Sequence, residues 1–279
     1  MTHKSGIAPL CDPAGNIVTD DSLKAKLLNS HFVKAGTTDD GILPPFDQAL
    51  QSGDVYFDKI YFESSDVYEI INSMNPTSSP GPDGFPPTLL INLKHQLCVP
   101  LSILFSLIFQ SGHLPEEWKT AIVKPIFKKG NSADPNNYRP ISLTSVFCKV
   151  FESIIKKYLL SYFNTFSLIS KHQHGFLANH STTTNLLECL NDWTSSLDQK
   201  HFVKVLYFDY AKAFDVVSIP KLMFKLSKLG IKGQLYSCIN SFLTNRTQRV
   251  MVGNATSGCL NLISGTPQGS VLGPFLFLL

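Results

Sequence analysis

Two short stretches, FDYAKAFD at residues 208–215 and GTPQGSVLGP at residues 265–274, decide how this sequence is interpreted. The first ends a continuous apolar run, Phe202–Phe208, which predicts a buried strand that delivers Asp209 at its end. The second combines glycines, a proline and one amide side chain, so it can turn bare backbone and Gln268 toward a ligand. We therefore expect Asp209 to face this turn across a cleft.

The composition is that of a folded protein with an uneven distribution of charge. With 279 residues, 43% hydrophobic and 16% charged, the chain is long enough for one large domain or two ordinary ones. Residues 1–75 carry five lysines and eleven acidic residues, whereas residues 76–279 carry nineteen basic and ten acidic residues. A basic body behind an acidic leader is compatible with a polyanionic partner.

Cysteines, histidines and apolar stretches exclude several classes of protein. The six cysteines lie far apart without a C-x-x-C pair, which argues against a zinc site or a dense disulfide framework. His172, His174 and His180 have no partner acid or cysteine at a spacing typical of a metal site. The N-terminus lacks a signal-peptide core, and the longest apolar stretch, Val99–Phe109, falls short of the roughly 20 residues that span a bilayer. We expect an intracellular protein, nuclear or cytoplasmic, that is neither secreted nor membrane-bound.

Helical patterns precede a few strand patterns, which predicts an α+β fold. Asp20 or Asp21 can cap a first helix closed by Gly36, and Asp66 with Glu69 has the spacing of a capping box. The remaining predicted elements are helices over 88–111, from Phe147 to Tyr158, after Ser181, from Pro220 to Leu229 and over 234–243, strands at Ala121–Phe127 and Phe202–Phe208, a loop at Asn137–Leu143, and a hairpin of 248–252 with 259–264 around Gly253-Asn254.

Two aspartates could hold a hard cation. Asp209 would emerge at the edge of a sheet, where its carboxylate could bind such an ion, although a strand-terminal Asp also commonly caps the next turn. Asp215 could be a second ligand or could orient the turn around Ala213-Phe214. The residues alone leave both alternatives open.

Three basic residues could contact phosphate groups. Arg139, beside Pro140, and the pair Lys128-Lys129 could donate to phosphate oxygens. A solvated basic loop is the alternative for the two lysines, and a plain surface loop is the alternative for the turn at Gln268-Gly269.

Six blocks occur in an order that resembles a known family. These blocks are SSPGPDG, W-x-x-A-x-x-x-P-I-F-K-K-G, N-Y-R-P-I-S-L, H-G-F-L-x-x-x-S-T-T, F-D-x-x-K-A-F-D and G-T-P-Q-G-S-V-L-G-P, all within residues 66–279. They resemble successive motifs of reverse transcriptases, in the branch carried by LINE-like, jockey-type retrotransposons that lack long terminal repeats. The leader DPAGNIVTDDSLKAKLLNSHF resembles the connector that precedes this domain in such elements.

The resemblance implies a right-hand polymerase that makes DNA on an RNA template with two Mg²⁺ ions, a DNA primer and deoxynucleoside triphosphates. Asp209 matches the family's first catalytic, metal-binding aspartate, assisted by the carbonyl of Tyr210, and Phe214 matches the aromatic gate beneath the sugar. The residues that match positions contacting the incoming nucleotide are Arg139, Lys128, Lys129, Gln268 and Gly269.

The same resemblance implies a division of the chain into three regions, and the sequence departs from the family in one respect. It implies an acidic connector at 1–65, a fingers-like region at 66–201 and a partial palm at 202–279. The family's Tyr-x-Asp-Asp hairpin and thumb are not seen, so we expect an incomplete right hand that is catalytically inactive as written. Two alternatives are a non-catalytic nucleic-acid-binding remnant and a structural α+β domain. The oligomeric state cannot be read from the sequence.

Overall fold

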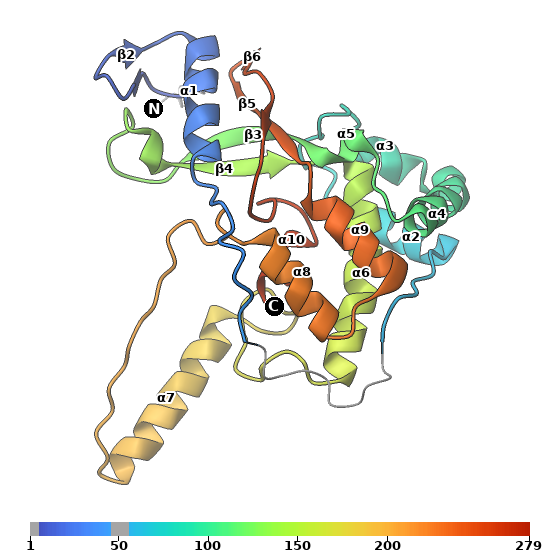
Figure 1. The fold of residues 1–279 in the computed structure, drawn as a ribbon, viewed down its shortest axis with the longest axis vertical. Helices are drawn as coiled ribbons and strands as arrows, with labels where there is room; N and C mark the ends of the chain where they lie inside the picture. The colour runs from blue at the N-terminus through green and yellow to red at the C-terminus, as the bar shows by residue number, and fades with distance from the viewer. Residues whose placement is uncertain (1–5, 46–55) are drawn as a thin grey trace.

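The computed structural model describes residues 6–45 and 56–279 (Figure 1). Its helices are α1 (Asp21–Val33), α2 (Ser64–Asn72), α3 (Pro87–Asn92), α4 (Lys94–Ser111), α5 (Glu116–Lys119), the 3₁₀ helix η1 (Pro135–Asn137), α6 (Val146–Thr165), α7 (Thr182–Asp198), α8 (Ile219–Lys228), α9 (Gly233–Leu243) and α10 (Gly273–Phe277). Its strands are β1 (Leu10–Cys11), β2 (Ile17–Val18), β3 (Thr120–Phe127), β4 (Tyr138–Leu143), β5 (Thr247–Val252), β6 (Ala255–Thr256) and β7 (Leu260–Asn261). The predicted α+β class is confirmed.

The main sheet has the order β4-β3-β5-β6, with β7 also pairing β5. Strand β3 runs antiparallel to β4 and parallel to β5. The prediction of a loop at Asn137–Leu143 was wrong, because most of this segment forms β4. Proline is tolerated at a sheet edge, where no neighbour needs its missing N–H, and Pro140 faces Pro125 across the β3–β4 pair.

The predicted hairpin around Gly253-Asn254 is confirmed. Met251 and Val252 of β5 pair with Thr256 and Ala255 of β6, so the two strands are joined by a two-residue turn. Residues 257–259, which follow β6, are not part of a strand. The hydroxyl of Ser257 still accepts from the backbone N–H of Val250 at 2.9 Å. The chain then pairs again with β5 as β7.

The first helix, α1, covers one face of this sheet. Its predicted start is confirmed, since the carboxylate of Asp20 accepts from the backbone N–H of Leu23 at 2.9 Å. Apolar side chains from α1 and the sheet form a small core: Leu10, Ala25, Leu28, Phe32, Val123, Tyr138, Val250 and Val252. This packing brings the end of α1 beside β4, where the candidate site begins.

A second, larger core surrounds α6. Figure 1 shows α6 running through the helical part of the molecule, and its side chains pack with residues of α2, α4, α8, α9 and α10. Phe151 of α6 stacks on Phe62 with ring centroids 5.1 Å apart. The predicted capping box at Asp66 was wrong: α2 begins at Ser64, and Asp66 instead pairs with Lys157 of α6 at 2.6 Å.

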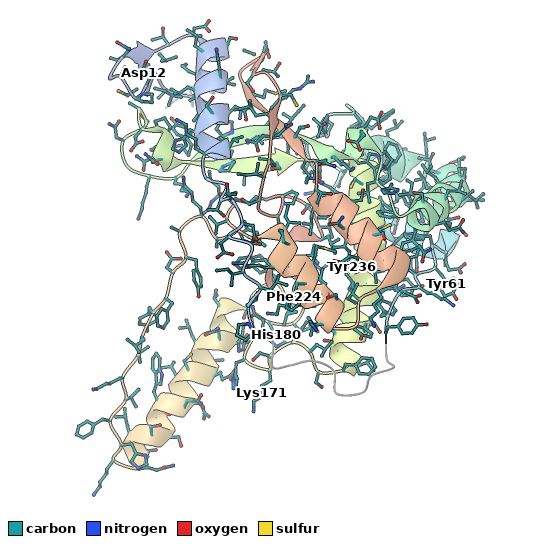
Figure 2. All side chains as sticks on the ribbon, in the orientation of Figure 1. Asp12, Tyr61, Lys171, His180, Phe224 and Tyr236 are labelled. Carbon is teal, nitrogen blue, oxygen red and sulfur yellow. The ribbon has the colours of Figure 1, made fainter. Side chains whose placement is uncertain are left out.

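An arm formed by α7 and the chain that returns from it projects from the body (Figure 1). The predicted cap is confirmed, because Ser181 and Thr184 form a capping box at the start of α7. No residue of α7 is buried, so the apolar residues at helical spacing do not face a core. His180 lies where the arm joins the body (Figure 2).

The strand predicted at Phe202–Phe208 was wrong. This segment is extended but forms no strand, and Phe202 is fully exposed. An apolar run becomes a strand only when another strand is available to complete its backbone hydrogen bonds. Among residues 6–45 and 56–279, no strand pairs with Phe202–Phe208. Asp209 is therefore presented by an irregular segment.

Candidate nucleotide-binding site

One cleft of about 660 Å³ brings together most of the residues that the sequence singled out. Its lining includes Lys128, Arg139, Asp209, Tyr210, Phe214, Gln268 and Gly269. Lys129 is exposed and does not line it. Since these residues come from segments far apart in the chain, the fold and not local sequence assembles the cleft.

Backbone hydrogen bonds join the chain around FDYAKAFD (residues 208–215) to the start of GTPQGSVLGP (residues 265–274). The N–H of Thr266 donates to the carbonyl of Phe214 at 2.8 Å, and the N–H of Gly265 donates to that of Val217 at 2.8 Å. Gly265 has a φ of +92°, and a Cβ built there would lie 2.7 Å from the carbonyl oxygen of Phe214. Only glycine allows this close approach.

The turn after Thr266 is fixed to the edge strand β4. The N–H of Ser142 donates to the carbonyl of Gln268 at 2.7 Å. Gly269 follows with a φ of +118°, and a Cβ at this position would overlap the carbonyl oxygen of Ser142. The turn therefore meets β4 backbone to backbone, three residues along the strand from Arg139.

Asp215 faces this turn. Its Oδ1 accepts from Nε2 of Gln268 at 3.1 Å. Burial raises the pKa of the Asp215 carboxyl, while the bond from Gln268 and the charges of Lys212 and Lys128 oppose this rise. The structure thus gives Asp215 a partner in the turn that carries Gln268, whereas the two alternatives for Asp215, a second cation ligand or orientation of the turn around Ala213-Phe214, stay predictions.

Asp209 and Tyr210 lie in the open part of the cleft, and both are exposed. Within the described ranges, no group of three or more His, Cys, Asp or Glu side chains could hold a metal ion. Mg²⁺ is, however, commonly held by one or two carboxylates together with substrate phosphates. The donor set at Asp209 thus fits part of a magnesium site.

Phe214 lies between two other aromatic rings. It stacks on Phe277 with centroids 4.5 Å apart, and the ring of Phe176 meets it edge-on at 5.7 Å. These contacts hold the Phe214 ring in place at the wall of the cleft. A fixed ring is what a steric gate needs, although the same contacts would also serve packing alone.

Basic side chains surround the cleft on several sides. Arg139 is an exposed residue of β4, and Lys128 lies just after β3. Lys212 lines the cleft in a left-handed backbone conformation with a φ of 52°. Such backbone strain in a non-glycine residue is often found at functional sites.

Sequence reasoning missed His31 as a residue of the cleft. It lies in the last turn of α1 and lines the cleft with Phe32. Burial lowers the pKa of the His31 imidazole, and the nearby positive charge of Lys212 lowers it further. Nothing in the local sequence indicated this position, because the packing of α1 on the sheet determines it.

Two of the three histidines near the base of the arm, His172 and His174, bond an acidic residue. Glu188 of α7 accepts from His172, and its other oxygen lies 2.7 Å from Nε2 of His174. The two histidine contacts lower the pKa of the Glu188 carboxyl. These contacts hold the loop before α7, which contains His172 and His174, against α7 and outside the cleft.

Residues 126–279 match the family model described as reverse transcriptase (RNA-dependent DNA polymerase). This is more than half of the chain, and the matched part contains the cleft residues from Lys128 onward. The chain belongs to the reverse transcriptase family.

Curated relatives place the chain among the polymerases of retrotransposons that lack long terminal repeats. It is 32% identical over 219 residues to the probable RNA-directed DNA polymerase from transposon X-element of Drosophila melanogaster, covering 78% of this chain and 24% of that protein. It is also 32% identical over 213 residues to the RNA-directed DNA polymerase from mobile element jockey of the same species, covering 76% and 23% respectively. A Pol polyprotein of element R2 from Popillia japonica is 28% identical over 203 residues, which are 72% of this chain and 27% of that protein. The chain thus spans about a quarter of the length of these relatives.

The part of the chain that the structure describes contains no helix of sufficient length and apolar character to cross a membrane.

Proposed function

We propose that this chain carries the nucleotide-binding part of an RNA-directed DNA polymerase that takes deoxynucleoside triphosphates, an RNA template and a DNA primer. The observation that supports this most is the cleft itself. Arg139, Asp209, Phe214 and Gln268 come from three separate segments, yet they line one cavity large enough for a nucleotide.

Each side chain has a role that follows from its place in the cleft. Arg139 and Lys128 would hold the triphosphate, since an arginine fork matches phosphate oxygens and a lysine acts as a point charge. Phe214 would lie beneath the sugar. Gln268 and Gly269 would line the base, where bare backbone lets a flat ring approach.

Asp209, with the carbonyl of Tyr210, would hold Mg²⁺. When bound, this ion supplies positive charge beside the reacting phosphate and promotes attack by the primer hydroxyl. The exposed position of Asp209 supports this assignment, because a hard cation with its waters and substrate phosphates needs open space. The further division into a connector at 1–65, fingers at 66–201 and partial palm at 202–279 stays a prediction.

Nucleotide binding by the chain tests the proposal. A fluorescent deoxyadenosine triphosphate would be titrated with Mg²⁺ present, and we expect saturable binding by the wild-type chain. Arg139→Ala should weaken binding about tenfold or more, since bonds to a charged group are worth roughly 1.5–3 kcal/mol. Lys232→Ala is the control, because this exposed lysine lies away from the cleft. Equal affinities for the two variants, or no binding by wild type, would overturn the proposal.

We expect the chain to bind nucleotide without extending a primer. Two-metal chemistry needs several carboxylates around the cations. The carboxylates that line the described cleft are those of Asp209 and Asp215, and Asp215 is engaged by Gln268. Template-dependent extension that Asp209→Ala abolishes would contradict this expectation.

A further inference from the structure

A buried glutamate lies behind the turn that carries Gln268. Glu152 belongs to α6 and is 1% exposed. Its Oε2 accepts from the backbone N–H groups of Val271 and Leu272, at 2.8 and 2.9 Å. Its Oε1 accepts from Sγ of Cys148 at 3.3 Å. The carboxylate thus joins the central helix to the chain immediately after Gly269 and Ser270.

The two amide groups need an acceptor at this position. Leu272 is the N-cap residue of the short helix α10 and Val271 comes just before it, so neither N–H has a partner within the helix. Ser270 supplies one acceptor locally, because its hydroxyl accepts from the N–H of Gly273 at 3.0 Å. One oxygen of Glu152, from a distant part of the chain, accepts from the two amides before Gly273, those of Val271 and Leu272.

Packing alone does not explain why an acidic residue occupies the buried position 152. A buried carboxylate is costly unless hydrogen bonds and an opposite charge compensate it. Burial raises the pKa of the Glu152 carboxyl. The hydrogen bonds from the backbone N–H groups of Leu272 and Val271 and the charge of Arg246 oppose this rise. Arg246 is itself 2% exposed and donates to the carbonyl of Phe242 at 2.8 Å. The hydrogen bonds from Val271 and Leu272 thus compensate part of the cost of burying this side chain behind the turn.

The turn is consequently held from three sides. Ser142 of β4 binds the carbonyl of Gln268, Asp215 binds the side chain of Gln268, and Glu152 binds the backbone of Val271 and Leu272. Of these three anchors, Asp215 lines the cleft. Glu152 holds the turn from the core, so it fixes the position of the chain immediately after Gly269 and Ser270.

We propose that Glu152 is a positioning residue for the nucleotide site: by binding the amides of Val271 and Leu272, it holds Gln268 and Gly269 at the wall of the cleft. This role rests on the proposed function, because Gln268 is assigned there to the incoming nucleotide. Glu152 itself does not line the cleft, so it would act through the turn and not by contact with a nucleotide.

Two substitutions separate this role from general stability. Glu152→Gln retains a carbonyl oxygen that can accept from both amides, whereas Glu152→Ala removes the acceptor. Ser241→Ala is the matched control: Ser241 is 5% exposed and its hydroxyl also accepts from a backbone amide, that of Leu114 at 3.0 Å. It lies on α9, away from the turn.

The experiment has two readouts on the full 279-residue chain. Hydrogen exchange of the Val271 and Leu272 amides should be at least tenfold faster in Glu152→Ala, and near wild type in Glu152→Gln and Ser241→Ala. The affinity for fluorescent deoxyadenosine triphosphate with Mg²⁺ should fall about tenfold in Glu152→Ala, recover in Glu152→Gln and stay unchanged in Ser241→Ala.

The outcomes distinguish the two proposals. If wild type binds nucleotide and Glu152→Ala binds it equally well, or if the two amides exchange at wild-type rates in Glu152→Ala, the positioning role is overturned. Equal losses in Glu152→Ala and Ser241→Ala would also overturn it, since a general loss of stability would then explain both. A wild-type chain that binds no nucleotide would overturn the proposed function, and the positioning role with it, whatever the exchange data show.

Discussion

The side-chain amide of Gln268 donates to Asp215, with Nε2 3.1 Å from Oδ1, across two segments that lie 53 positions apart in the sequence. The bond leaves the amide oxygen of Gln268 available to a ligand. It also gives Asp215 a partner, which lowers the cost of partly burying a carboxylate. The pair thus links the FDYAKAFD and GTPQGSVLGP stretches through side chains as well as backbone.

A double-mutant cycle should detect this link. We expect Asp215→Ala and Gln268→Ala each to lower the free energy of unfolding, and the double variant to lose less than the sum of the two. The coupling should be about 1 kcal/mol, as for directly bonded side chains. Urea unfolding of the four proteins measures it, and strict additivity would show that the bond contributes nothing.

Gly269→Ala should destabilise the protein strongly. Its backbone is in the left-handed region, and the new methyl group would overlap the carbonyl oxygen of Ser142. We expect a loss of about 2 kcal/mol or more in the free energy of unfolding.

Gly258→Ala is the matched control for this change, since a Cβ there meets nothing within 4 Å. It should leave the midpoint of thermal unfolding within a few degrees of wild type. Similar losses in both variants would mean that the close approach at Gly269 is not what requires glycine.

Phe214→Val should relax the choice of sugar. If the Phe214 ring excludes a 2′-hydroxyl, the smaller side chain should bring the affinities for ribo- and deoxynucleoside triphosphates closer together. Competition titrations with both nucleotides would measure this. A destabilised variant with unchanged selectivity would instead show that stacking on Phe277 is the whole role of Phe214.

His31 should make stability depend on pH. Burial and Lys212 lower its folded-state pKa below the usual 6.5, so folding favours the neutral imidazole. Its stabilising contribution is therefore fully present above pH 6.5 and is lost as the pH falls through the lower folded-state value. Urea unfolding between pH 5 and 8 should show this decline, and His31→Gln should flatten it. An equal decline in the variant would assign the effect to other groups.

Binding of RNA should weaken steeply with salt. Residues 76–279 carry an excess of basic over acidic side chains, and contacts between these groups and phosphates release counterions. Fluorescence anisotropy with a labelled RNA between 50 and 200 mM salt would give the slope of log affinity against log salt concentration, which we expect to be clearly negative. Affinity independent of salt would favour the structural alternative.

Local signals in the sequence predicted much of the fold. A few neighbouring residues determine the cap of α1, predicted at Asp20 or Asp21 and found at Asp20, and likewise the cap at Ser181 and the hairpin at Gly253-Asn254, both of which were predicted correctly. The errors at β4 and at Phe202–Phe208 have one cause, since whether a segment becomes a strand depends on which partner it finds. Pro140 made β4 look like a loop, yet it lies at a sheet edge that tolerates it.

In the cleft, too, features set by neighbouring residues could be predicted, whereas features set by distant partners could not. The motifs, which follow one another in the order of the family, identified Arg139, Asp209, Phe214 and Gln268. A motif can be recognised from neighbouring residues even when its partners in the structure are far away in the sequence. The motifs could not reveal His31 or Glu152. The role of each depends on tertiary packing, in one case of α1 on the sheet and in the other of α6 behind the turn.

The pairing of β3 with β5 has a consequence for synthesis on the ribosome. Thr120 of β3 pairs with Thr247, which is 127 positions later in the chain. At about 5–20 residues per second, β3 is made roughly 6 to 25 s before its parallel neighbour exists. The turn at Gln268-Gly269 is made later still. A nascent chain therefore holds an unpaired strand edge for seconds before the cleft can form, which makes this interval a natural point for chaperone binding or for misassembly.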